Sequence, residues 1–120
     1  MDTFDPQYIQ RIRQYGGDQL VHQMVELFFT SGPDRTQEIL SALRSDDLER
    51  AERVAHSLKS SAGNLGAVRV QRLAEAIEHA CHNGDADSAK TNATMLEEAI
   101  GEALTILSSY RQSQPCTESR

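Results

Sequence analysis

The chain has no tryptophan, few aromatic residues and no long apolar run, and these absences exclude several classes of protein. No apolar stretch approaches the roughly 18 residues that are needed to cross a bilayer. The acidic start of the chain lacks the basic and apolar pattern of a secretory signal. The formal net charge is −6, and the lysines and arginines are scattered, so there is no basic footprint for nucleic acid. We therefore expect a cytoplasmic protein that binds neither membrane nor nucleic acid.

Cysteine is also scarce, with Cys81 and Cys116 as the two examples. Cys81 falls on the apolar side of a predicted helix, where a free thiol packs as a small hydrophobic group. Cys116 falls in a polar C-terminal segment. A disulfide between them is possible, but a reducing compartment disfavours it.

Most of the sequence shows helical periodicity. Its 120 residues are enough for one domain with a single modest core, and apolar residues recur at intervals of three and four along most of the chain. Asp5 and Pro6 predict the start of a short first helix, which ends near Gly16. A second helix begins after Asp18. Pro33 is expected to kink it rather than divide it, because the apolar phase continues beyond the proline.

Three further helices follow, separated by short connections. Asp46 and Glu49 have the spacing of a capping box at the start of the first of them, and Gly66 is placed to end that helix in the left-handed conformation. The next helix begins at Ala67 and ends at Gly84, and the last carries an apolar seam from residue 89 to residue 110. Because short connections favour antiparallel neighbours, the predicted fold is all-α. We expect residues 1–112 to form an antiparallel four-helix bundle with the short N-terminal helix packed across one end, and residues 113–120 to form a polar, frayed tail.

The helix that ends at Gly66 carries a histidine on its polar side. At about 100° per residue, His56, Lys59, Ser60 and Gly63 gather on one side together with Glu52. The opposite side is an apolar stripe made of Leu48, Ala51, Val54, Ala55, Leu58, Ala62 and Leu65. A reactive imidazole is therefore displayed to solvent beside an ammonium group.

The residues that follow Lys59 are unusually small for a helix. Glycine inside a helix costs about 1 kcal/mol relative to alanine, so Gly63 needs a reason, and close approach of a partner is the simplest one. Lys59, one turn after His56, can bring its charge to an anion held at the imidazole. We interpret this face as a surface for docking and chemistry.

The same segment resembles the signature of the histidine-containing phosphotransfer (HPt) domain. That signature has a histidine, then Leu-Lys-Gly-Ser after one intervening residue, and Leu-Gly-Ala a few residues later. The residues that carry the resemblance are His56, Leu58, Lys59, Ser61, Leu65, Gly66 and Ala67. The layout is also similar, with two helices before the motif and two after it. Ser60 departs from the pattern, since the family most often has glycine there. Its side chain leaves slightly less space for a partner to approach His56.

The resemblance implies a mechanism. HPt domains accept a phosphoryl group from the aspartyl phosphate of a receiver domain and pass it to another receiver, so His56 is the implied phospho-acceptor and Lys59 the neighbouring cation. Ser60, Gly63 and Glu52 are expected on the docking face, where Glu52 either contacts the ring or only solvates the face. The partners implied are response-regulator receiver domains or a hybrid sensor histidine kinase. The chain needs no cofactor of its own, because Mg²⁺ is expected on the receiver, and we expect a monomer.

Two other readings of the sequence stay open. The sequence has no P-loop or glycine-rich nucleotide motif, so we expect a relay without kinase activity. The first alternative is an adaptor, because the same face could dock receivers without being phosphorylated. A small metal-binding helical protein is the other alternative, because His79 and His82 lie near Glu75 and Glu78. The Glu-x-x-His pairs of di-iron bundles are absent, and we predict a solvated face there and no metal site. His22 is interpreted as a packing residue at the rim of the core.

Overall fold

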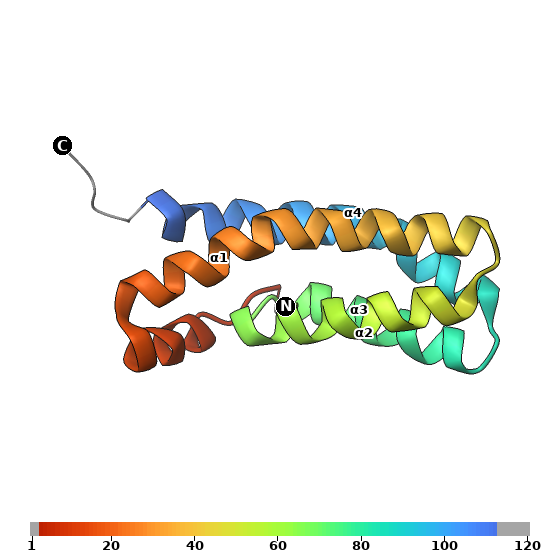
Figure 1. Cartoon of the computed structure of the whole chain (residues 1–120), viewed down its shortest axis with the longest axis horizontal. Coiled ribbons are helices and arrows are strands. Elements are labelled where there is room, and N and C mark those ends of the chain that lie inside the picture. Colours follow the sequence, from red (N-terminus) through yellow and green to blue (C-terminus); the bar gives the residue numbers. More distant parts are fainter. Residues whose placement is uncertain (1–2, 113–120) are drawn as a thin grey trace.

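The computed structural model describes residues 3–112 of the chain, and this part contains four helices. They are α1 (Gln7–Arg44), α2 (Leu48–Leu65), α3 (Val68–His82) and α4 (Ala86–Gln112). Each packs against two neighbours in the cyclic order α1, α2, α3, α4. Figure 1 shows α1 and α4 side by side above α2 and α3. The predicted all-α bundle is confirmed, and no strand occurs within the described residues. The predicted tail, with Cys116, lies outside them.

Gly17 separates a short N-terminal helix from the rest of α1. Its backbone (φ 73°, ψ −170°) is the non-helical point inside α1, and a positive φ of this kind is one that glycine adopts at little cost. The preceding turns lie at the end of the bundle, at the left of Figure 1, where Ile9 is fully buried. The chain then runs through Pro33 with helical angles, so the proline does not divide the helix. The buried Thr36 hydroxyl donates to the Gly32 carbonyl in this turn (2.9 Å).

The turn from α1 to α2 corrects one prediction. Asp46 has a positive φ of 57°, and the amide of Asp47 donates back to the Ala42 carbonyl (2.8 Å), which is the arrangement that closes a helix C-terminus. The N-cap of α2 is Asp47, whose carboxylate accepts a hydrogen bond from the Arg50 amide (3.1 Å). The predicted capping box of Asp46 and Glu49 is therefore wrong by one residue, because Asp46 is used to end α1.

The corner between α2 and α3 also holds the N-terminal segment. Gly66 caps α2 in the left-handed conformation (φ 80°), as predicted. Its carbonyl accepts a hydrogen bond from the Asp5 amide (2.8 Å), and the Arg69 amide donates to the Thr3 carbonyl (3.2 Å). A Cβ on Gly66 would lie 2.2 Å from the Asp5 carbonyl oxygen. Glycine is therefore required here by backbone angle and by space together.

The core lies between the helices and is aliphatic. The α2 contribution is a stripe of five buried residues, Ala51, Ala55, Leu58, Ala62 and Leu65. Cys81 is also buried, and burial raises the pKa of its thiol, with a smaller contribution from the Glu52 charge. Because this stripe fixes the rotation of α2, the opposite side of the helix faces solvent. No helix among residues 3–112 has the length and apolar character that spanning a membrane requires.

Candidate functional site

His56 projects from the solvent side of α2. Its side chain is 61% exposed, whereas its neighbours Ala55 and Leu58 are fully buried. The apolar stripe thus holds the helix in place while the imidazole stays accessible. This outward orientation is what the helical projection predicted.

A carboxylate from α3 joins His56 to Lys59. Nδ1 of His56 lies 2.8 Å from Oε2 of Glu78, and Nζ of Lys59 lies 2.8 Å from Oε1 of the same carboxylate. The Glu78 side chain is 21% exposed and Lys59 28%. One carboxylate therefore holds both the ring and the ammonium group, each on its own oxygen.

The charges of this cluster stabilise one another. Partial burial of the Glu78 carboxyl opposes its ionisation, but the hydrogen bonds and charges of Lys59 and His56 outweigh burial and lower its pKa. The hydrogen bond to Glu78 raises the pKa of Lys59, against a smaller desolvation effect. Glu78 is therefore a carboxylate and Lys59 an ammonium ion at neutral pH.

Glu52 contacts His82 and not the His56 ring, so of the two roles left open for it the ring contact is not found. Its Oε2 lies 3.2 Å from Nδ1 of His82 on α3. Both His79 and His82 are exposed, as predicted. With Glu52, Lys59, Glu75 and Glu78 they line a polar hollow between α2 and α3. We call this side of α2 the α3 flank. Within the described residues no group of three or more histidine, cysteine, aspartate or glutamate side chains could hold a metal ion.

Gly63 has a neighbour inside the chain. A Cβ at this position would lie 2.9 Å from Nε2 of Gln71 on α3, so the missing side chain makes room for the Gln71 amide. The sequence argument, which assigned the small residue to an approaching partner, overlooked this internal contact. Ser60 is exposed. Ser61 faces α1 and accepts a hydrogen bond from Nη1 of Arg35 (2.9 Å).

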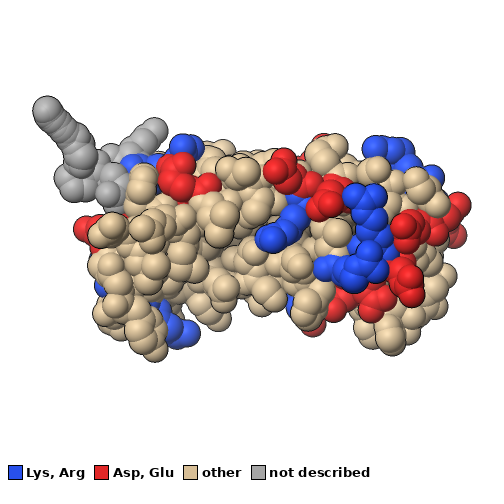
Figure 2. Space-filling model, in the orientation of Figure 1, with Lys and Arg blue, Asp and Glu red and all other residues tan. Residues whose placement is uncertain are grey.

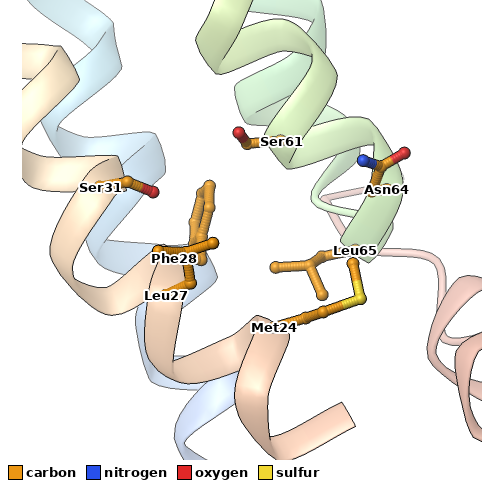
Figure 3. Close-up of a pocket in the computed structure, with 7 residues that line it drawn as sticks. All are labelled: Met24, Leu27, Phe28, Ser31, Ser61, Asn64 and Leu65. Atoms are coloured by element: carbon orange, nitrogen blue, oxygen red, sulfur yellow. The ribbon is translucent and has the colours of Figure 1, made fainter. Parts of the chain in front are cut away.

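The opposite side of α2 borders α1, from which Arg35 reaches Ser61. A shallow pocket of about 90 Å³ lies there, drawn in Figure 3. Leu27 at its edge is 68% exposed. We call this surface the α1 flank, and its pocket is lined by Met24, Leu27, Phe28, Ser31, Ser61, Asn64 and Leu65.

Figure 2 shows how the charges are distributed over the face that α1 and α2 form. Lysine, arginine and acidic side chains gather towards the right end, where α1 passes into α2. Ion pairs such as Arg50 with Glu38 (3.3 Å) belong to that end. Much of the left half of the face carries no charged side chains. The α1 flank therefore combines exposed apolar groups with small polar ones.

Sequence reasoning missed the role of Glu78, although a signal was available. It considered Glu78 only as part of a metal site with His79 and His82. Because Gly66 ends α2 and α3 starts almost at once, the two helices form an antiparallel hairpin. Residues at nearly equal distances from that corner lie side by side, and His56 and Glu78 meet this condition. Counting outward from Gly66 would have paired them. His22, in contrast, is half-buried with Nε2 4.0 Å from Glu26.

Comparison with known proteins identifies the fold and the family of the chain. A structure of histidine-containing phosphotransfer protein B (HptB) from Pseudomonas aeruginosa PAO1 is similar with a TM-score of 0.88 and 18% sequence identity, covering 94% of this chain and 97% of that one. This likeness shows the fold. No curated protein matched the sequence. The family model described as the Hpt domain matches residues 23–109, a range that includes His56, Lys59 and Glu78. The chain therefore belongs to the Hpt domain family, whose members are phosphorelay intermediates and not kinases.

Proposed function

We propose that this protein accepts a phosphoryl group on His56 from the aspartyl phosphate of one receiver domain and passes it to another receiver. The observation that carries the proposal is the state of the imidazole. Nδ1 is held by Glu78, and no described residue makes a hydrogen bond to Nε2. Nε2 is thus the ring nitrogen available to a partner.

The three residues of the site have separate roles in this reaction. With its proton on Nδ1, neutral His56 has the electron pair on Nε2 that attacks phosphorus in line with the departing aspartate oxygen. Glu78 orients the ring, since it accepts the hydrogen bond from Nδ1. Lys59, one turn along the helix, supplies positive charge to the phosphoryl oxygens. Phosphoryl transfer depends mainly on such positioning and charge neutralisation, and we assign the Mg²⁺ ion and the acidic pocket to the receiver.

The receiver is proposed to dock over the α1 flank and reach His56 from there. An acidic pocket is repelled by the glutamates of the α3 flank, whereas the pocket of the α1 flank is lined by no acidic residue, and this flank carries Arg35 and the exposed Leu27. Ser60 lies between this surface and His56, and its small side chain allows close contact. Relay partners must separate after transfer, so we expect a modest, transient interface with a monomeric protein in the cytoplasm.

Transfer of label from a phosphorylated receiver tests the proposal. The receiver is charged with radioactive phosphate and mixed with this protein. We expect acid-labile, alkali-stable label on the wild-type chain, and none on His56→Gln. His82→Gln is the matched control, because it removes an exposed histidine of the same region and should be labelled normally. Label that persists on His56→Gln would exclude His56 as the acceptor.

An adaptor that docks receivers without phosphorylation is the alternative. It predicts that His56→Gln and the wild-type chain bind receivers equally and that neither becomes labelled. The contacts of Glu78 with both His56 and Lys59 favour the relay, because docking alone does not require an oriented imidazole beside an ammonium group.

A further inference from the structure

The contact between Nδ1 of His56 and Glu78 has a consequence for the phosphorylated protein, which rests on the proposed function. A phosphoryl group on Nε2 leaves Nδ1 where it is, against Oε2 of Glu78 at 2.8 Å. The second oxygen of the same carboxylate is held by Lys59, also at 2.8 Å. The carboxylate is fixed at both oxygens, so it stays aimed at Nδ1 when the other side of the ring changes.

We propose that Glu78 keeps the proton on Nδ1 after transfer, so that phosphorylated His56 is held as a phosphoimidazolium, the form that releases its phosphoryl group readily. Glu78 is on this proposal a positioning residue that acts through the imidazole. The charge of Glu78 sets how far the pH can rise before phosphorylated His56 loses its ability to pass the phosphoryl group on.

The transfer steps balance without any further reactant. In the first step the electron pair on Nε2 forms the P–N bond, and the P–O bond to the receiver aspartate breaks with its electrons going to that aspartate. The ring keeps the Nδ1 proton and becomes a cation. In the second step a carboxylate oxygen of the next receiver attacks phosphorus, and the P–N bond electrons return to Nε2. The leaving group is neutral imidazole. If Nδ1 had lost its proton, the leaving group would be imidazolate, which is far poorer.

The surroundings of the ring favour retention of the proton. Glu78 contacts His56 from α3, and Glu75, His79 and His82 line the polar hollow beside Glu78. Glu52 lies one turn away on α2, bound to His82. Lys59 opposes them, but it is paired to Glu78. From α1, Arg35 reaches Ser61 on the other flank. Glu78 is the acidic group in contact with the ring, and a hydrogen bond to a charged acceptor is about twice as strong as a neutral one.

The test compares the wild-type chain with Glu78→Gln, which keeps the shape and removes the charge. Glutamine can accept a hydrogen bond from protonated Nδ1 or donate one to bare Nδ1, so it no longer selects the protonated form. Each protein is labelled by a charged receiver, purified and mixed with a fresh receiver between pH 6 and pH 9. We expect similar transfer rates near pH 6. As the pH rises, the rate of Glu78→Gln should fall about one pH unit earlier, making it roughly tenfold slower at pH 8.

Two further measurements keep the outcome decisive. Glu75→Gln removes a nearby charge without touching the ring, and its pH profile should match that of the wild-type chain. Nitrogen NMR of ring-labelled protein, phosphorylated chemically with phosphoramidate, reports directly on the proton at Nδ1 of His56. Equal pH midpoints for the wild-type chain and Glu78→Gln, by rate or by NMR, would overturn the inference. Failure of the wild-type chain to transfer label at any pH would instead sink the proposed function, and the NMR titration would still test the role of Glu78.

Discussion

On the side of α2 that faces α3, the surface beside His56 is made mostly of charged side chains. On the side that faces α1, serine, asparagine and apolar groups line the pocket, and Arg35 contributes a positive charge beside Ser61. The α3 flank orients the imidazole through the hydrogen bond to Glu78. The α1 flank offers the shallow pocket beside Leu27. A single helix thus separates a surface suited to chemistry from one suited to contact. Variants on the first should change the rate of transfer, and variants on the second the affinity for the partner.

Lys59→Gln should give the largest effect of the substitutions outside His56. It removes the cation beside the phosphoryl group and releases one oxygen of Glu78. We expect the single-turnover rate of transfer to fall roughly tenfold to a hundredfold, with the affinity for the receiver unchanged within about twofold. Rapid-quench kinetics at saturating receiver measure the rate. Lys90→Gln on α4 is the control, and a loss of affinity without a loss of rate would contradict the assignment of Lys59.

Leu27→Glu should produce the complementary result. The side chain is 68% exposed, so the fold should tolerate the change, but it places a negative charge where the acidic receiver is proposed to dock. We expect the dissociation constant to rise about tenfold, equivalent to about 1.4 kcal/mol, while the rate at saturation stays close to normal. Calorimetric titration with a receiver gives the constant. Met95→Glu, at an exposed position on α4, should leave it unaltered; equal effects of both variants would argue against the α1 flank.

Gly63→Arg tests whether added bulk on the α3 flank slows transfer. An arginine there must displace the Gln71 amide and extend over the α3 flank, so transfer should slow by about threefold to tenfold. Gly63→Ala requires only a small shift of the flexible Gln71 side chain, and its gain in helix propensity of up to about 1 kcal/mol offsets that strain. Its transfer rate should remain near normal. Unchanged transfer by Gly63→Arg would mean that the small residue serves only the contact with Gln71.

The pH dependence of stability should give the smallest effect. The pKa of Glu78 is lower in the folded chain than in the unfolded one, so its stabilising contribution is present above the unfolded pKa and is lost as pH falls through the folded value. The wild-type chain should therefore lose melting temperature relative to Glu78→Gln below about pH 4.5. Because the cluster is partly exposed, the relative change should not exceed a few degrees. Parallel melting curves by circular dichroism would contradict this stabilising role.

Local sequence patterns predicted the features that depend on one helix at a time. The outward direction of His56 follows from the apolar stripe beneath it, and the helix end at Gly66 follows from the left-handed preference of glycine. The capping residue was misplaced because two adjacent aspartates compete for it, and only the backbone angle of Asp46 decides between them. The contacts of Glu78 with His56 and of Gln71 with Gly63 depend on the register between α2 and α3. The periodicity of one helix carries no information about that register.

The hydrogen bonds that tie Thr3 and Asp5 to the α2–α3 corner have a practical consequence for handling the protein. Residues 3–5 thus bridge the end of the hairpin that carries the histidine, and we call them the N-terminal clasp. An affinity tag fused directly before Thr3 would crowd this clasp, and a deletion through Pro6 would remove it and bare Ile9. Work with purified material should therefore carry its tag elsewhere, and deletion series from the amino end should lose thermal stability abruptly once Asp5 is gone.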